Sequence, residues 1–449
     1  MSYSPSNNDL RSWFDAIPAF CDGSDTPRAY LERCIQVIEA RENTIKAFVS
    51  MDVDSARNQA DQSTSRYREG RALSGVDGMP YGVKDLFKTS DFPTAIGSSI
   101  FEGKKHWADS AHVFALKKLG AVLLGKTTLP ELGSGEPPPT RNPYDLTRSP
   151  GGSSSGSAAA VGAGMVPAAS GSQGRGSILR PASFCGNWAL KPTLGALHSG
   201  GLLWRSPSYS VMGVHAGTLD DCWLVATSIA QVVGGDPGYP GLYGANNLLN
   251  TKPRALGILE TAGWDLAEDP YKERLFGVID CLSEHGVKIV TRHGCAEIEA
   301  LEQALTLLPT YRPRIAAWDI KWPASIVREI GQNKVTPRLL KQFEENEKIT
   351  LEEYRDALIS LAELRDVFEA ASSLVDGFIT LSSPGMPPVG IDTGDSIFGD
   401  PSSALGAPAL NLPLLEDRGL PMGIQLLGQP HNDFKLAQIA KWLATIDVR

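Results

Sequence analysis

Serines with possible chemistry concentrate in residues 149–176, SPGGSSSGSAAAVGAGMVPAASGSQGRG, where bulky side chains are nearly absent. So many small residues indicate that the backbone approaches another group closely. A flexible linker is disfavoured, because residues 158–166 are apolar and Phe184 and Trp188 follow soon after. A serine hydroxyl in such a site becomes a useful nucleophile only when a neighbouring base takes its proton.

Short motifs in this segment admit other interpretations, and each is weak. Residues 152–156 match G-x-S-x-G, but that motif needs an acid and then a histidine downstream, and nothing around His285, His293 or His431 looks like a placed triad histidine. Residues 162–164 begin a dinucleotide fingerprint that Met165-Val-Pro does not continue. No Walker motif occurs.

A longer series of motifs carries more information than any of these. In order along the chain, the series resembles the amidase signature family, nearest to stand-alone bacterial amidases, aryl amidases and urethanases with Gln in the serine loop. The matching runs are Gly78-Met-Pro-Tyr-Gly-Val-Lys-Asp85, Gly125-Lys-Thr-Thr-Leu-Pro-Glu131, Thr140-Arg-Asn-Pro-Tyr-Asp145, the run 148–161, Gly176-Ser-Ile178, Pro181-Ala-Ser-Phe-Cys-Gly186, Leu190-Lys-Pro-Thr193 and, more weakly, 419–428.

By this resemblance Ser177 is the nucleophile, Ser153 a proton relay and Lys84 the base. Lysine accepts a proton only when neutral, so Lys84 must be desolvated and its pKa lowered. Taken alone, each residue has a plainer explanation: a surface lysine paired with Asp85, a helix-capping serine and a turn serine. The order of the family motifs favours the catalytic interpretation.

The resemblance also implies an oxyanion hole, in which backbone N–H groups stabilise the charge that develops on the carbonyl oxygen. Gly174, Arg175, Gly176 and Ser177 are expected to supply these donors. Small side chains there keep the amides accessible.

Several positions in the serine loop depart from the common family pattern. Many members have Asp where this chain has Gln173, Thr at Gly174 and Gly at Arg175. The family's arginine commonly stands two residues after the nucleophile, where this chain has Leu179, and here it follows one residue later. We expect Arg180 to be a partnered structural arginine, with substrate binding as the alternative. Arg175 either points to solvent or an acidic partner, or lines the substrate entrance.

The substrate pocket is expected between the loop 197–212 and a helical insertion. Aromatic groups there favour an apolar or aryl substrate, although tryptophan and tyrosine are also ordinary core residues. The residues expected to wall the pocket are Leu202, Trp204, Arg205 and Tyr209 in the loop, and Trp318, Ile320 and Trp322 in the insertion.

The patterning around these residues predicts an α/β fold, and the resemblance implies a large mixed β-sheet flanked by helices, with a helical insertion. We expect one domain over residues 1–449. Its parts are N-terminal helices (1–75), a core with the catalytic residues (76–222), a variable helical region that shapes the pocket (250–370) and a return to the core sheet (371–449).

Composition excludes several other classes of protein. The formal net charge is −9 and no basic run occurs, which argues against nucleic acid as a partner. No stretch approaches the about 18 apolar residues that span a bilayer, and the start lacks a secretory pattern, so we expect a cytoplasmic protein with no membrane partner. The six cysteines and seven histidines form no disulfide framework or metal motif, so no metal or cofactor is expected.

The expected function is therefore hydrolysis of the C–N bond of a small amide, anilide or carbamate through an acyl-enzyme. That is an amidase, an acylamide amidohydrolase, with esterase or urethanase activity also open, acting as a monomer or homodimer. The alternatives are a catalytically silent binding protein and a transamidosome-like glutamine amidotransferase subunit.

Overall fold

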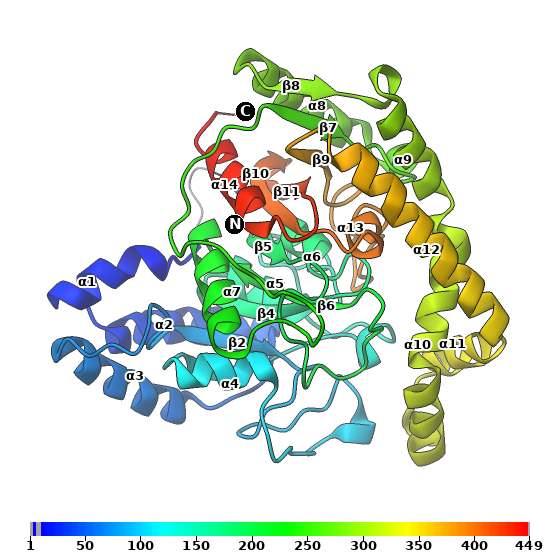
Figure 1. Cartoon of the computed structure of the whole chain (residues 1–449). Coiled ribbons are helices and arrows are strands. Elements are labelled where there is room, and N and C mark those ends of the chain that lie inside the picture. Colours follow the sequence, from blue (N-terminus) through cyan, green and yellow to red (C-terminus); the bar gives the residue numbers. More distant parts are fainter. Residues whose placement is uncertain (1–2, 6–9, 448–449) are drawn as a thin grey trace.

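The computed structural model describes residues 3–5 and 10–447 and is built around one mixed sheet (Figure 1). Its strand order is β1-β3-β2-β4-β6-β5-β10-β11-β9-β7-β8. The α/β class and the mixed sheet are thus confirmed. The strands are β1 (Phe48–Met51), β2 (Pro80–Lys84), β3 (Val122–Thr127), β4 (Ala168–Gln173), β5 (Trp188–Lys191), β6 (Val211–Ala216), β7 (Ala255–Ile258), β8 (Lys288–Val290), β9 (Gly377–Leu381), β10 (Ala409–Asp417) and β11 (Leu420–Leu427).

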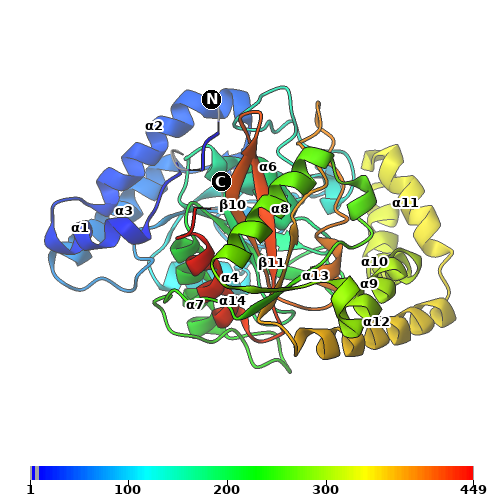
Figure 2. The same cartoon turned by 90° about the horizontal axis from the view of Figure 1, so that it is seen from above.

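Helices cover the sheet, and those before and after the core lie at opposite ends of the molecule. In both views α1–α3 and α10–α12 are on opposite sides (Figures 1 and 2). Among the described residues, no helix is long and apolar enough to cross a membrane. The α-helices are α1 (Ile17–Asp22), α2 (Pro27–Ile45), α3 (Val53–Arg68), α4 (Ala111–Lys118), α5 (Ser155–Gly162), α6 (Leu179–Cys185), α7 (Leu219–Val233), α8 (Asp269–Glu284), α9 (Ala296–Thr306), α10 (Leu308–Gly331), α11 (Pro337–Glu347), α12 (Leu351–Ser372), α13 (Asp400–Ala404) and α14 (Asp433–Leu443).

Two regions expected to be wholly helical contain strands. Phe48 and Val49 continue the apolar spacing of α2, yet they lie in β1, which pairs antiparallel with β3 at the sheet edge. The insertion likewise contains β7 and β8, which extend the sheet in parallel beside β9. In each case a short apolar run is too brief for its period to be recognised, and pairing across the fold decides its structure.

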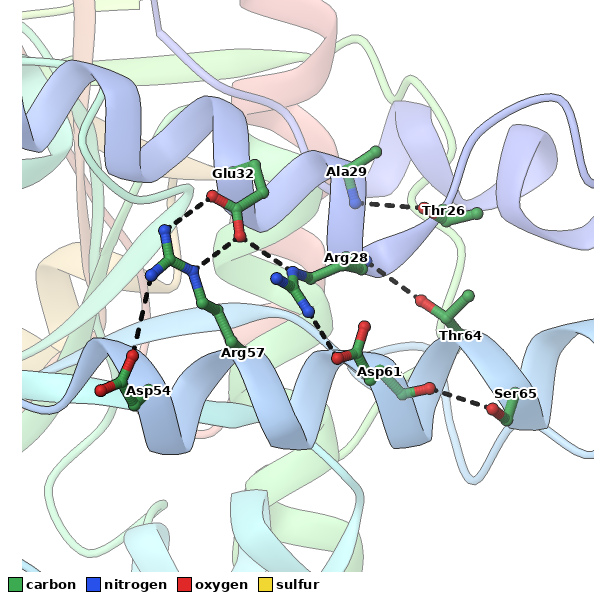
Figure 3. A network of polar contacts seen from close by, with 9 residues as sticks. All are labelled: Thr26, Arg28, Ala29, Glu32, Asp54, Arg57, Asp61, Thr64 and Ser65. Carbon is green, nitrogen blue, oxygen red and sulfur yellow. Dashed lines mark hydrogen bonds and ion pairs between the residues drawn. The ribbon is translucent and has the colours of Figure 1, made fainter.

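Helices α2 and α3 are tied together by charged side chains (Figure 3). Glu32 accepts from Nε of Arg28 at 2.9 Å and from Nε of Arg57 at 2.8 Å, and Arg28 also pairs with Asp61. These side chains are about one third or more exposed to solvent, so each pair contributes little to stability. The network fixes how the two helices lie side by side rather than holding the domain together.

The central strands β2, β3 and β4 place the chemistry. All three are fully buried, and β2 is parallel to both neighbours. Their carboxyl ends therefore meet at one edge of the sheet, with Lys84 beside Thr127 in register. Helix α5 packs against this edge, and its Gly156 donates from N to the carbonyl oxygen of Thr128 at 3.1 Å.

Gly156 sets how closely α5 approaches the sheet. A Cβ there would lie 2.1 Å from the oxygen of Ala47 and 2.4 Å from the nitrogen of Thr128, both backbone atoms. We predict that Gly156→Ala lowers the free energy of unfolding by about 1 to 3 kcal/mol, because the helix must move outward. Urea denaturation measures the change.

The matched control is Gly277→Ala in α8, where nothing lies within 4 Å of an added Cβ. That change should instead raise stability by about 0.5 to 1 kcal/mol through helix propensity. Equal effects at the two glycines would contradict the packing argument.

Candidate active site

Lys84 ends β2 with its amine enclosed by serine hydroxyls. Its side chain is completely buried. Nζ hydrogen-bonds with Oγ of Ser153 at 2.8 Å, Oγ of Ser172 at 2.9 Å and Oγ of Ser154 at 3.1 Å. Ser172 comes from β4, and the other two come from the turn before α5. The three hydroxyls give the amine hydrogen-bond partners but no charge.

The expected plainer role of Lys84, an ion pair with Asp85, does not occur. Asp85 instead pairs with Lys126, at 3.0 Å between Oδ1 and Nζ, and both of these side chains are buried. Within the described residues no carboxylate lies in salt-bridge range of Lys84. Burial therefore acts unopposed and holds the pKa of Lys84 well below that of free lysine. An amine in this state is able to accept a proton.

Arg180 fixes the peptide that carries Ser153. Its guanidinium is buried and donates to the carbonyl oxygens of Gly152 and Gly394. Burial lowers the pKa of Arg180 to about 10. The peptide bond between Gly152 and Ser153 is cis. These contacts with backbone favour the structural role expected for this arginine over substrate binding.

Ser177 lies beside the relay turn and is partly exposed. Its carbonyl oxygen accepts from the backbone N of Ser154 at 3.3 Å, which brings the two serine segments together. Between β4 and α6, the backbone N–H groups of residues 174–177 donate to no acceptor in the described part of the chain. Unused donors next to an accessible hydroxyl are what an oxyanion hole requires.

Gln173 organises this loop, a role that its departure from the common pattern did not reveal. Its Oε1 accepts from the backbone N of Ile178 at 2.9 Å and of Leu179 at 3.2 Å. Its Nε2 donates to the hydroxyls of Ser402 and Ser403. One amide thereby caps the start of α6 and joins the loop to α13, and both ends of its side chain are needed.

The residues expected to wall the pocket have different surroundings. Trp204 is partly exposed, with its ring 5.8 Å from that of Phe343 in α11. Arg205 pairs with Asp236 at 3.7 Å. Tyr209 is 2% exposed and lies in the core, where its hydroxyl donates to a backbone carbonyl, so it packs beneath the site rather than facing an open pocket.

The insertion residues are equally mixed. The ring of Trp318 stacks on Tyr354 at 5.4 Å, whereas the ring of Trp322 is 76% exposed. Asp319, between them, accepts from the hydroxyl of Ser206 and so ties α10 to the pocket loop. The loop and the insertion are therefore in contact, as expected, although aromatic character alone did not identify the contacting residues.

Two other kinds of site have little support in this structure. His215, near Lys84, is completely buried with its Nδ1 3.1 Å from Oδ1 of Asn187, and burial lowers its pKa to about 3. It is held neutral inside the sheet. Among the described residues, no three His, Cys, Asp or Glu side chains gather as metal ligands would. The chemistry of the site rests on hydroxyls, one amine and backbone amides.

Comparison with known proteins agrees with this geometry. The Amidase family model matches residues 29–437, which include all the residues described above. The chain belongs to the Amidase family. It is an amidase, a hydrolase of amide C–N bonds, and this bears out the expected enzyme class.

Relatives of this amidase span almost its whole length. A glutamyl-tRNA(Gln) amidotransferase protein of Picosynechococcus is 31% identical over 90% of this chain and 91% of its own. A fatty acid amide hydrolase of Arabidopsis thaliana is 28% identical over 90% of this chain and 71% of its own. The solved peptide amidase of Stenotrophomonas maltophilia, at 24% identity, shares the fold, with a TM-score of 0.77 and 96% of each chain covered.

The lowered pKa of Lys84 has a consequence for the pH dependence of the amidase. A lysine with a depressed pKa is neutral above that value and protonated below it, so activity should fall as the pH drops through it. We predict that kcat/KM rises with pH through one ionisation well below the pKa of free lysine. Lys84→Ala should lower activity roughly 10²- to 10⁴-fold and remove this ionisation. A rise centred where free lysine titrates would refute a neutral base.

Proposed function

We propose that this amidase works alone on small molecules, cleaving carboxylic amides, anilides or carbamates through an acyl-enzyme on Ser177. Ser153 is the relay and Lys84 the base. One observation carries the assignment: the buried amine of Lys84 lies 2.8 Å from the hydroxyl of Ser153 and has no carboxylate partner among the described residues. A charged, paired lysine could hold a structure together, but it could not accept a proton.

In the acylation step the oxygen of Ser177 attacks the carbonyl carbon. Its proton passes to Ser153, which gives its own proton to Lys84. The carbonyl oxygen takes up negative charge opposite the unused N–H groups of the loop. The C–N bond then breaks as the proton returns from Lys84 through Ser153 to the leaving nitrogen. The products are a neutral amine and an ester of Ser177.

Deacylation uses the same groups on a water molecule. Water attacks the ester carbon while its proton passes to Ser153 and on to Lys84. When the bond to Ser177 breaks, the proton returns to the oxygen of Ser177. The acid leaves and the triad is restored, so each cycle consumes one water and needs no cofactor.

The alternative is one component of an amidotransferase that supplies ammonia to a partner protein. The relative from Picosynechococcus carries such a name. Arg175 and Leu179 depart from the motif of that branch. Arg175 also forms an ion pair at 3.5 Å with Asp400, so its departure is built into the structure of the loop. A protein that acts alone, as a monomer or homodimer, is the simpler interpretation, and a silent binding protein would not need a desolvated base.

A screen of the purified chain without partners tests the function. We predict hydrolysis of at least one anilide, primary amide or carbamate, and complete loss in Ser177→Ala, because that change removes the covalent step but only one partly exposed hydroxyl. Circular dichroism and thermal unfolding should match the wild type. Ammonia release from glutamine alone would favour the amidotransferase. Turnover near the wild-type rate in Ser177→Ala would overturn the nucleophile assignment.

The relay predicts a dependence on the leaving group. An amide nitrogen must be protonated before it leaves, whereas an activated phenoxide needs little help. We therefore expect Ser153→Ala and Lys84→Ala to lose more acylation rate with an anilide than with the matched phenyl ester. Pre-steady-state acylation of both substrates measures the ratio. Equal losses would exclude proton delivery through the relay.

A further inference from the structure

Asp400, the first residue of α13, is shared by two arginines from different parts of the chain. Its Oδ1 lies 2.7 Å from Nε of Arg312 in α10, and its Oδ2 lies 3.5 Å from Nε of Arg175 in the serine loop. The side chains of Arg312 and Asp400 are 8% and 11% exposed, whereas that of Arg175 is 52% exposed. We call these three residues the Asp400 bridge.

Further contacts fasten the serine loop to both sides of this bridge. Arg312 donates from Nη2 towards the carbonyl oxygen of Gly174 at 3.5 Å, and the hydroxyl of Ser403 donates to that of Arg175 at 3.0 Å. A Cβ on Gly399 would lie 2.5 Å from Cα of Gly176, so α13 begins directly against the loop. Three successive residues of the loop are therefore held from outside it.

The other side of the bridge is anchored in the insertion. The guanidinium of Arg312 lies 5.1 Å from the ring centroid of Tyr209, which covers it. Arg365 of α12 donates from Nε to the carbonyl oxygen of Ala404 at 2.9 Å and from Nη2 to that of Ser208. In both views α13 lies between the sheet and the α10–α12 helices (Figures 1 and 2). The short α13 is thus held at its two ends by the insertion.

From these contacts we infer that Arg312 and Asp400 are positioning residues, which act through residues 174–176 to hold the oxyanion donors in place. The inference rests on the proposed function of Ser177 and its loop. Donors of this kind stabilise charge only when they are aimed at the oxygen beforehand. An error of about 1 Å in placement lowers a rate by roughly 10²-fold. The insertion therefore contributes to the rate as well as shaping the pocket.

Four variants test the bridge: Arg312→Met, Asp400→Asn, their double variant, and the milder Arg312→Lys. The matched control is Arg328→Met, on the same helix, where the arginine pairs with Glu347 away from the serine loop. For each variant we would measure kcat and KM on the best substrate of the screen, and the inhibition constant of phenylboronic acid, whose serine adduct carries a negatively charged tetrahedral boron. Assays are run below the melting temperature of each variant.

We expect Arg312→Met and Asp400→Asn to lower kcat roughly 10- to 100-fold and to weaken phenylboronic acid by a similar factor, with KM nearly unchanged. The double variant should be little worse than the poorer single one, because both break the same link. Arg312→Lys should recover part of the loss, and Arg328→Met should show none.

A folded Arg312→Met enzyme with wild-type kcat and boronic acid affinity would overturn the inference. So would equal losses in Arg328→Met, which would mean a general effect on α10. An active Ser177→Ala enzyme would instead defeat the proposed function itself, so the two failures are distinguishable. Losses in KM alone would place the bridge in substrate binding and also count against positioning.

Discussion

The desolvation of the Lys84 amine is the constraint on which the rest of the site depends. Removing an ammonium group from water is costly, and the usual remedy is a carboxylate partner. Here the nearby carboxylate, Asp85, is committed to Lys126, and Lys84 has only hydroxyls around it. The small residues of β4 and α5 follow from this, because serine and glycine let two strands and a helix close around the amine without adding charge.

The nucleophile side of the site obeys a different requirement, which is accuracy of backbone placement. A loop whose N–H groups must remain unpaired cannot be held by those groups, so its carbonyl oxygens and its ends must be held instead. Gln173 holds the segment that follows the nucleophile, while α13 and α10 hold the carbonyls that precede it. An ionised carboxylate at position 173 could not make both sets of contacts, since one end of the amide donates and the other accepts.

Local residue patterns and ordered motifs predicted the α/β class, the mixed sheet and the three residues that the structure assembles around one edge. They worked because each motif is contiguous and its spacing is tied to one strand or turn. They did not predict β1 or β7, which are too short to have a readable period, nor the choice of Lys126 by Asp85. They also missed Arg312 and Asp400, since nothing in the surrounding sequence shows that residues so far apart share one ion pair.

The shared carboxylate of Asp400 also bears on how such enzymes can diversify. An insertion that lines a substrate pocket looks like a part that recombination could exchange freely between homologues. In this chain it carries one cation of a three-membered charge set whose other members lie in α13 and the serine loop. A transplanted insertion without an arginine at that place would leave a poorly solvated carboxylate beside the oxyanion donors. New specificity here is therefore more accessible through point changes in the helices than through replacement of the whole segment.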